Sequence, residues 1–167
     1  MKYSTFSIED INIRMDIRPG DLGYVIHRHG AMYAREYNYG ISFEAYVAKG
    51  ISEFYQNYDS KKDRVWICEH QGKIIGSLFF QHRENKKAQL RYFYLESEYR
   101  GIGLGKSLMN LFIDFYKKRG YTSSYLWTTE ELDIATSLYT RHGFSLTEEI
   151  STNSFGKELV ERKYELV

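Results

Sequence analysis

The residues best suited to chemistry form a short glycine-rich run, Arg100-Gly101-Ile102-Gly103-Leu104-Gly105-Lys106, between a predicted strand and a long predicted helix. Alternate glycines let the backbone turn tightly and approach a ligand closely. The N–H groups at the start of a helix lack partners within the helix and attract anions, phosphate above all. This run therefore predicts a phosphate-binding loop.

Three phosphate-binding patterns compete for these residues. The P-loop pattern G-x-x-x-x-G-K-[ST] is matched at its end by Gly105-Lys106-Ser107, but Arg100 stands where its first glycine belongs. The dinucleotide pattern G-x-G-x-x-G fails because Lys106 takes the place of its third glycine. The pattern [QR]-x-x-G-x-[GA] is satisfied by Arg100, Gly103 and Gly105. A glycine-rich helix start that binds no ligand is the remaining interpretation.

A second group of polar residues lies in the first predicted helix. His27 and His29 are two positions apart, so they point in different directions on a helix, and no third ligand is evident. We therefore expect no metal site. Either they line the wall of an acceptor pocket or they belong to a solvated helix face. Tyr33 and Glu36 follow at helical spacing and could line the same wall. Cys68 lies among apolar strand residues, which favours a core position.

Hydrophobic periodicity predicts seven strands and four helices. Asp21 and Ser42 are predicted to cap the first two helices. Short turns between the middle strands indicate antiparallel pairing, whereas the strand–helix–strand unit at 88–129 favours a parallel pair. We expect a mixed, mostly antiparallel α/β (α+β) sheet flanked by helices. The predicted strands are 11–18, 64–69, 73–82, 88–95, 123–129, 144–150 and 160–167, and the predicted helices are 22–37, 42–55, 103–119 and 131–142.

Length and composition favour one domain over residues 1–167, with residues 1–10 loosely held. Lys+Arg number 23 and Asp+Glu 22, so bulk charge predicts neither a nucleic-acid partner nor an anionic membrane. One cysteine excludes an internal disulfide, and no secretory signal or membrane span is visible, so we expect a cytoplasmic protein. Aromatic residues make up 17%, which suits pocket walls and is compatible with a homodimer.

The [QR]-x-x-G-x-[GA] loop resembles the acetyl-CoA pyrophosphate loop of the GNAT acetyltransferase superfamily. A second segment, Ala135-x-x-Leu138-Tyr139-x-x-x-Gly143-Phe144, is similar to a helix end of those enzymes. The segments 18–37, 126–128 and 154–166 resemble the acetyltransferase half of MarR–GNAT fusion proteins. A DNA-binding MarR half is absent, so we expect a free-standing GNAT domain. The chain departs from the family at Ser97, which replaces a frequent proline, and at 129–132, where a frequent asparagine is missing.

The resemblance implies an N-acetyltransferase that moves an acetyl group directly from acetyl-CoA to a primary amine, without a metal. It implies that the N–H of Leu95 stabilises the oxyanion and that Tyr139 protonates the leaving thiolate, although Tyr139 could instead be a packing residue. The edge of the strand 88–95 would hold the pantetheine arm. The implied cofactor-binding residues are Phe93, Tyr94, Leu95, Arg100, Gly101, Ile102, Gly103, Leu104, Gly105, Lys106, Ala135 and Tyr139.

Transfer to an amine also needs a proton acceptor, because a free alkyl amine has a pKa of about 10. Glu96, at the end of a predicted strand, is one candidate base, and Glu36, His27 and His29 are others. The residues His27, His29, Tyr33 and Glu36 are the expected acceptor-binding set. Two alternatives remain: a non-catalytic module of the same fold that senses acyl-CoA or binds a partner, and an enzyme that uses a longer acyl donor.

Overall fold

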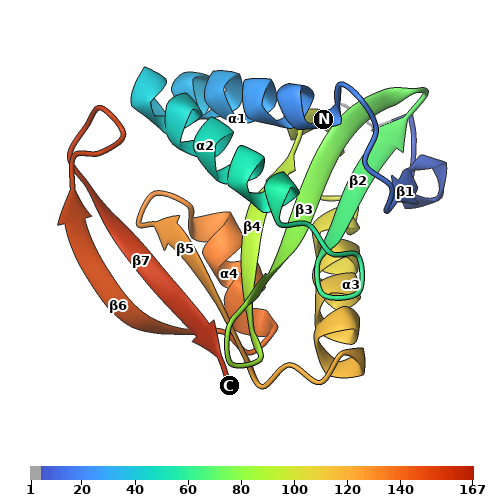
Figure 1. Cartoon of the computed structure of the whole chain (residues 1–167). Coiled ribbons are helices and arrows are strands. Elements are labelled where there is room, and N and C mark those ends of the chain that lie inside the picture. The colour runs from blue at the N-terminus through green and yellow to red at the C-terminus, as the bar shows by residue number, and fades with distance from the viewer. Residues whose placement is uncertain (1–4) are drawn as a thin grey trace.

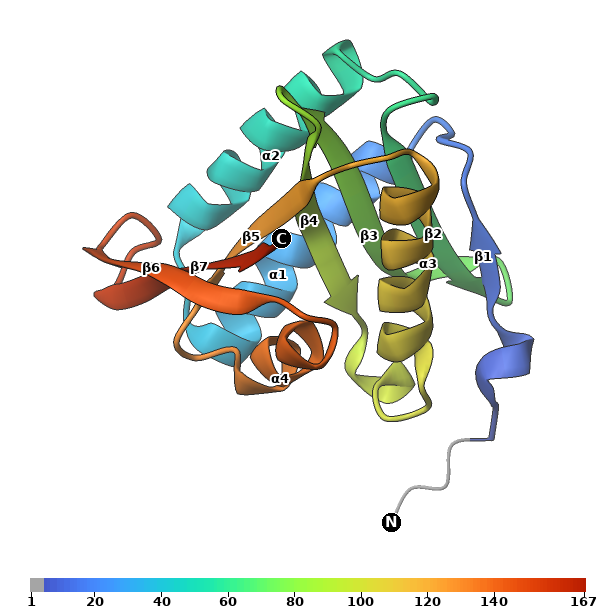
Figure 2. The same cartoon turned by 90° about the horizontal axis from the view of Figure 1, so that it is seen from below.

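The computed structural model describes residues 5–167. A seven-stranded sheet has the order β1-β2-β3-β4-β5-β7-β6. Helices α1 and α2 cover one face of this sheet, and α3 and α4 cover the other (Figures 1 and 2). The helices are α1 (Asp21–Tyr37), α2 (Ile41–Gln56), α3 (Leu104–Lys118) and α4 (Asp133–Arg141), and the strands are β1 (Asn12–Arg14), β2 (Arg64–His70), β3 (Lys73–Arg83), β4 (Lys87–Leu95), β5 (Ser123–Thr129), β6 (Ser145–Thr152) and β7 (Leu159–Leu166).

Strand pairing agrees with the predicted mixed sheet. Every pair is antiparallel except β4 with β5, which run parallel. That parallel ladder joins only 87–89 to 123–125, and beyond it the two strands separate. The predicted fold class is therefore confirmed, and the sheet has a split at its centre.

A bulge in β4 sets which side chains face each layer. Tyr92 has a positive φ of 50°, and the register with β3 shifts between Ser77 and Phe79. Ser77 Oγ donates a hydrogen bond of 2.7 Å to the Tyr92 carbonyl, which stabilises the irregular backbone. After the bulge, Phe93 and Leu95 pack into the α3–α4 core, while Tyr94 packs into the α1–α2 core.

Two apolar cores lie on opposite faces of the sheet. The core under α3 and α4 includes Leu108, Phe112 and Phe80, each with no exposed surface. The core under α1 and α2 is rich in aromatic rings, such as Phe54 and Phe79. Within residues 5–167, no helix combines the length and the apolar composition needed to span a bilayer.

The N-terminal prediction needs correction. The strand expected over 11–18 pairs only at 12–14, because the buried guanidinium of Arg14 draws the following chain around itself. It donates to the Asp16 carbonyl at 2.6 Å and to the Asp21 carboxylate at 2.8 Å. Asp21 therefore binds Arg14 and the Arg18 N–H at 2.7 Å, and Gly20 is the residue that precedes α1.

The start of α2 also differs from the prediction, because Ser42 lies inside the helix and Gly40 precedes it. Gly40 donates its N–H to the Phe155 carbonyl at 2.8 Å. A Cβ atom at position 40 would lie 3.5 Å from the Gly156 Cα, so this close approach to the C-terminal segment determines where α2 begins.

The predicted loose segment 1–10 lies in part outside the described residues, since only 5–10 are described. Residues Ile8–Asp10 form a short 3-10 helix, and the Phe6 ring stacks on Tyr99 with centroids 4.5 Å apart. Another 3-10 turn, Ser97–Tyr99, follows β4. The sequence did not indicate either turn.

His29 makes the stability of this fold depend on pH. It is 3% exposed, and its Nδ1–H donates to the Val25 carbonyl at 2.8 Å. Burial lowers the pKa of His29 from 6.5 to about 4. Between about pH 4 and pH 6.5 the unfolded chain therefore binds more protons than the folded protein. Stability thus falls as the pH drops from about 6.5 to about 4.

We predict that this histidine accounts for about 3 kcal/mol of that loss, at 1.36 kcal/mol for each unit of pKa. His29→Phe should reduce the difference between the unfolding free energies at pH 7 and pH 4 by that amount, measured by urea denaturation. The matched control is His27→Phe, because His27 lies on the same helix and is exposed. An equal pH dependence in all three proteins would contradict the prediction.

Candidate active site

The glycine-rich run forms an open turn at the start of α3. Gly101 and Gly103 have φ angles of 81° and 89°, which residues other than glycine rarely adopt. Gly103 precedes the helix, and no side chain caps the free N–H groups that follow it. A Cβ atom at Gly101 would meet nothing within 4 Å, and one at Gly103 would meet only Ile8 at 4.0 Å. This helix start therefore has room for an anion and free N–H groups to bind it.

Gly105 brings this helix start close to β4 and α4. A Cβ atom at position 105 would lie 3.2 Å from Leu138 and 3.7 Å from both Phe93 and Leu95. Ala135 packs against the same core. The structure thus brings together three predicted cofactor-binding segments: the loop, the end of β4 and the start of α4. Lys106 is exposed on the first turn of α3.

The backbone of Leu95 faces away from β3. The Glu96 N–H donates to the Ile75 carbonyl at 2.9 Å, and residues in an antiparallel ladder alternate in the side to which their polar groups point. Leu95, opposite Gly76, therefore directs its N–H and C=O toward the side from which β5 has separated. Its C=O accepts a hydrogen bond of 3.0 Å from Arg100 Nε, in agreement with this orientation.

Arg100 and Glu36 form a link between the loop and α1. The guanidinium that binds the Leu95 carbonyl also pairs with the Glu36 carboxylate at 3.0 Å. The Arg100 side chain is thus directed at α1 and β4, so the free groups of the loop are those of its backbone. Glu36 is engaged in this ion pair.

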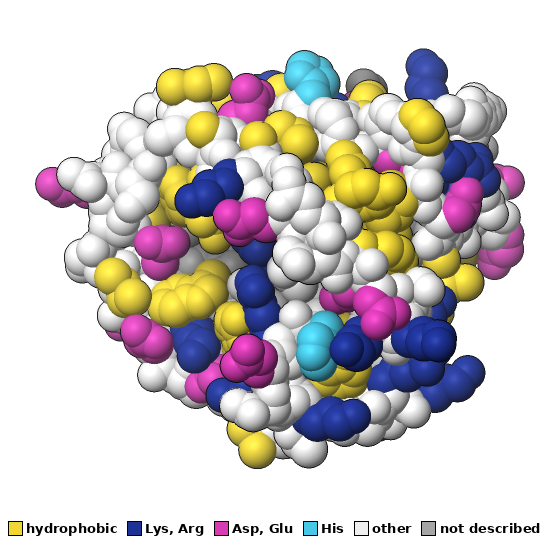
Figure 3. Space-filling view, viewed as in Figure 1, with side chains coloured by type: hydrophobic (Ala, Val, Ile, Leu, Met, Phe, Trp, Pro, Cys, Tyr) yellow, Lys and Arg dark blue, Asp and Glu magenta, His cyan; other side chains and the backbone are white. Residues whose placement is uncertain are grey.

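A cavity of about 120 Å³ lies where β4 and β5 separate. Residues 89–93 of β4 and 127–129 of β5 line two of its sides, and residues of α1, α2, α4 and the C-terminal segment line the rest. In the space-filling view the surface is hollowed between the α1–α2 layer and the β5–β7 side (Figure 3). Of the predicted site residues, His29, Tyr33, Phe93 and Tyr139 line this cavity.

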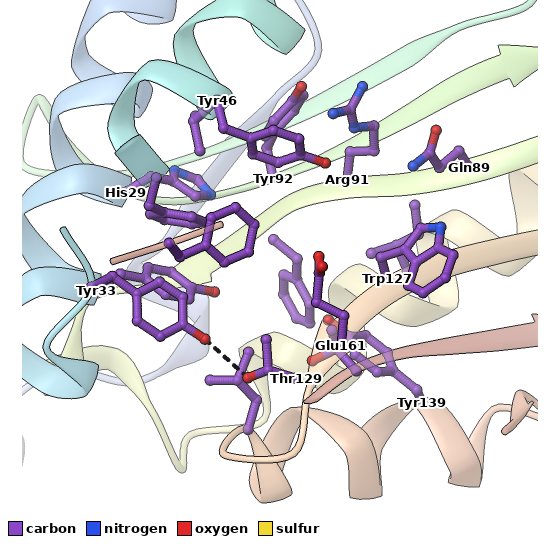
Figure 4. A pocket seen from close by; sticks show the side chains of 18 residues that line it. His29, Tyr33, Tyr46, Gln89, Arg91, Tyr92, Trp127, Thr129, Tyr139 and Glu161 are labelled. Carbon is purple, nitrogen blue, oxygen red and sulfur yellow. Dashed lines mark hydrogen bonds between the residues drawn. The ribbon is translucent and has the colours of Figure 1, made fainter. Parts of the chain in front are cut away.

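Tyr139, from α4, lies at the base of the cavity (Figure 4). It is 6% exposed, and its ring lies 6.2 Å from that of Phe93. Burial raises the pKa of Tyr139 well above its ordinary value, so the hydroxyl keeps its proton at neutral pH. Tyr139 can therefore act as a hydrogen-bond donor at the junction between the cavity and the loop.

Aromatic residues of α1 and its C-terminal loop form another wall. Burial raises the pKa of Tyr33 far above 10, and that of Tyr39 to about 12, so both phenols are neutral. The hydroxyls of Tyr39 and Thr129 share a hydrogen bond of 3.0 Å, which joins this wall to β5. Phe155 stacks on Tyr39 with centroids 5.6 Å apart. The first two helices and the segment near residue 155 thus enclose one cavity.

The other candidate bases lie elsewhere. The Glu96 carboxylate is held by the Arg28 guanidinium, with Nη2 at 2.9 Å, and it is not among the described side chains that line the cavity. His27 is exposed on the outer face of α1, which agrees with the solvated alternative. Within residues 5–167, no three carboxylate, histidine or cysteine side chains meet in a group that could hold a metal ion.

The sequence analysis missed Glu161, a carboxylate on β7 that lines the cavity. Glu161 pairs in register with Thr129 of β5, and burial raises the pKa of its carboxyl group above 4.5. The alternation in 160–167 correctly indicated a strand. The face on which Glu161 lies could be assigned only once β7 was known to pair with β5.

Comparisons with known proteins agree with this geometry. The model of the acetyltransferase (GNAT) family matches residues 31–144. Over 116 residues the chain is 29% identical to "N-acetyltransferase family 8 member 2" of Rattus norvegicus, covering 64% of this chain and 51% of the relative. Over 97 residues it is 29% identical to "Uncharacterized N-acetyltransferase YjgM" of Escherichia coli, covering 56% and 58%. The chain spans about half the length of these curated relatives.

Solved structures share the fold over nearly the whole chain. A GNAT-family acetyltransferase from Staphylococcus aureus Mu50 aligns with a TM-score of 0.75 and 22% identity, covering 93% of this chain and 98% of that one. A GNAT-family acetyltransferase from Elizabethkingia anophelis, solved with acetyl-CoA bound, aligns with a TM-score of 0.64 and 14% identity, covering 95% and 98%. With a family model that spans more than half of its length and a fold shared with these structures, the chain belongs to the acetyltransferase (GNAT) family.

Proposed function

We propose that this protein is an N-acetyltransferase that moves an acetyl group directly from acetyl-CoA to a primary amine. The observation that carries the proposal is the open, uncapped helix start at Gly103, which lies beside the free edge of β4. A diphosphate suits the first feature and an amide-containing arm suits the second. The acetyl-CoA bound in the structure of the Elizabethkingia anophelis acetyltransferase supports the same donor.

The residues fit acetyl-CoA in two places. The backbone N–H groups that follow Gly103 would hold the diphosphate, because Gly101 and Gly103 leave open space above them. The edge of β4 at 93–95 would hold the pantetheine arm, because β5 does not pair there. When bound, the thioester supplies an activated acetyl group with a thiolate as its leaving group.

Leu95 and Tyr139 would act on the two sides of the C–S bond that breaks, Leu95 at the carbonyl group and Tyr139 at the sulfur. The Leu95 N–H points toward the separated side of β4, where it would donate to the carbonyl oxygen as negative charge develops. The Tyr139 hydroxyl would donate its proton to the departing sulfur. Burial keeps this phenol protonated at neutral pH, so its hydroxyl is present as a hydrogen-bond donor to the sulfur.

Other parts of the proposal concern setting and partners. Cys68 is a free, buried thiol, which is compatible with a reducing cytoplasm. Three features stay predictions: the resemblance to MarR–GNAT acetyltransferase halves over 18–37 and 154–166, a homodimeric state, and a single functional domain over 1–167. An acetyl rather than a longer acyl donor also stays a prediction.

The direct test is release of free thiol from acetyl-CoA in the presence of a panel of primary amines. Release that depends on the amine, with the acetylated amine identified by mass spectrometry, is the expected result. Tight binding of acetyl-CoA with no turnover on any amine would instead identify an acyl-CoA sensor.

Gly103→Val should weaken acetyl-CoA binding by about 10- to 100-fold. The reason is that losing one backbone hydrogen bond to a charged phosphate costs about 1.5–3 kcal/mol. Gly120→Val is the matched control. Gly120 also has a positive φ, 70°, and open space around its Cβ, but it lies at the far end of α3. Both variants should lose similar stability, whereas only the first should lose affinity in calorimetry. Equal affinities would refute the loop assignment.

Tyr139→Phe should lower kcat by about 100-fold while leaving the Kd for acetyl-CoA unchanged, since it removes only the proton donor. Tyr116→Phe serves as its control, because Tyr116 is similarly buried at 9% exposure and belongs to the same core but does not line the cavity. Stopped-flow measurement of a single turnover would separate chemistry from product release. A Tyr139→Phe variant with full activity would show that Tyr139 only packs.

A further inference from the structure

The cavity contains one carboxylate with no countercharge from the protein. Among the described residues that line it, the charged side chains are Arg91 and Glu161. The nearby cations of the C-terminal segment pair elsewhere: Lys157 with Glu131, Arg162 with Glu149 at 2.8 Å, and Lys163 with Glu165 at 3.2 Å. Within residues 5–167, no salt bridge includes Glu161.

Arg91 does not supply the missing charge. Its Nη1 donates to Gln81 at 3.1 Å, and its guanidinium stacks on the Tyr92 ring at 4.7 Å from the centroid. The same group lies beside α2, where a Cβ at Gly50 would approach its Nη2 to 2.8 Å. In the close-up the guanidinium of Arg91 points away from Glu161 (Figure 4).

The Glu161 side chain points into the cavity, between Tyr33 on one side and Trp127 on the other (Figure 4). Aromatic rings dominate the walls around it, including Tyr46, Tyr92 and Phe155. Glu161 is half-buried, and a cation bound at such a carboxylate gains from both the ion pair and the negative faces of the surrounding rings. The cavity is therefore suited to an ammonium group attached to a flat apolar body.

The remaining groups around Glu161 are neutral near pH 7 or already engaged. Burial lowers the pKa of His29 to about 4 and raises the pKa values of Tyr33, Tyr39, Tyr92 and Tyr139. The Thr152 hydroxyl opposes the effect of burial on the pKa of Glu161 itself. In the part of the chain that the structure describes, no Lys or Arg side chain pairs with this carboxylate, so a ligand cation meets no competitor there. The groups that face it are His29 and Tyr33 of α1, Tyr39, Tyr46 of α2, Arg91 and Tyr92 of β4, Tyr139 of α4 and Thr152 of β6.

We propose that Glu161 binds the ammonium group of the acceptor and is the general base that removes its proton, and that the acceptor is a compact arylalkyl amine without an adjacent carboxylate. This inference rests on the acetyltransferase function proposed above. Glu161 takes one proton from R–NH₃⁺ and later releases it to solvent. As the C–N bond forms and the C–S bond breaks, the departing thiolate takes a proton from Tyr139. The tyrosinate then takes the second proton of the nitrogen, so Tyr139 is restored and one proton is released to solvent for each acetyl group transferred.

Burial also predicts how the role of Glu161 depends on pH. The folded-state pKa of this carboxyl group is raised, so ionising it opposes folding as the pH rises through that value. Glu161→Gln should thus be at least as stable as the wild type at pH 7. If Glu161 served only to stabilise the fold, Glu161→Gln would be less stable than the wild type at pH 7.

The test combines activity with direct binding. Glu161→Gln should lower kcat/KM for 2-phenylethylamine by about 100-fold or more at pH 7 and remove the acidic limb of its pH profile. Calorimetry should show a weaker Kd for the same amine, by about tenfold, and an unchanged Kd for acetyl-CoA. The matched control is Glu165→Gln, because Glu165 lies on the same face of β7 and pairs with Lys163 outside the cavity.

Three amines test the acceptor class. Phenylalanine has the same body as 2-phenylethylamine with an added carboxylate, and butylamine lacks the ring. Both should give a kcat/KM at least tenfold lower than that of 2-phenylethylamine. A preference for phenylalanine, or equal use of butylamine, would overturn the class.

The outcomes separate the two proposals. If the wild type acetylates no amine, the acetyltransferase proposal fails. If it acetylates amines and Glu161→Gln matches it in kcat/KM and amine affinity, only the assignment of Glu161 fails.

Discussion

The separation of β4 from β5 is the constraint on which the rest of the site depends. Parallel pairing ends after 87–89 and 123–125, so the last part of β4 has a free edge in the middle of the sheet. An unpaired edge inside a sheet leaves backbone groups without partners, which is costly unless a ligand or a side chain satisfies them. Arg100 satisfies one of them, the Leu95 carbonyl. The free edge and the cavity are two consequences of the same divergence.

Several contacts hold the separated strands in place. On the α3–α4 side, Leu138 and the absence of a side chain at Gly105 allow the start of α3 to approach the end of β4. On the other side, the hydrogen bond between Tyr39 and Thr129 fixes the end of β5 to the loop that follows α1. The bulge at Tyr92 shifts the alternation of β4, so Leu90 and Phe93 face the α3–α4 core while Tyr92 and Tyr94 face the α1–α2 core. The glycine-rich helix start and the cavity therefore lie on either side of the same strand.

Two ion pairs link α1 to the end of β4. Arg28 binds Glu96, and Glu36 binds Arg100 beside the glycine-rich loop. The Arg100–Glu36 pair is partly exposed, and such pairs contribute about 1 kcal/mol or less to stability. Both pairs also position side chains at the end of β4. They explain why two sequence-based candidates for the base, Glu36 and Glu96, lie outside the cavity. A carboxylate near the active site in sequence can be needed to hold a guanidinium.

The sequence allowed prediction of features that depend on local patterns. The glycine run, the helix that follows it and the parallel unit at 88–129 were correct because their signals lie in neighbouring residues. The caps at Asp21 and Ser42 were wrong because distant partners, Arg14 and the Phe155 carbonyl, determine those turns. Glu161 was missed for the same reason, since its face depends on pairing with β5.

Glu161 shows how that non-local information bears on chemistry. The same burial that opposes ionisation of its carboxylate increases the strength of any ion pair it forms, because the local dielectric is low. Arg162 and Lys163 follow it directly in the sequence, yet both pair with other carboxylates. A protein selected only for stability would gain from pairing or replacing this charge. An unpaired carboxylate among aromatic rings is therefore best explained by a cation that arrives with the substrate.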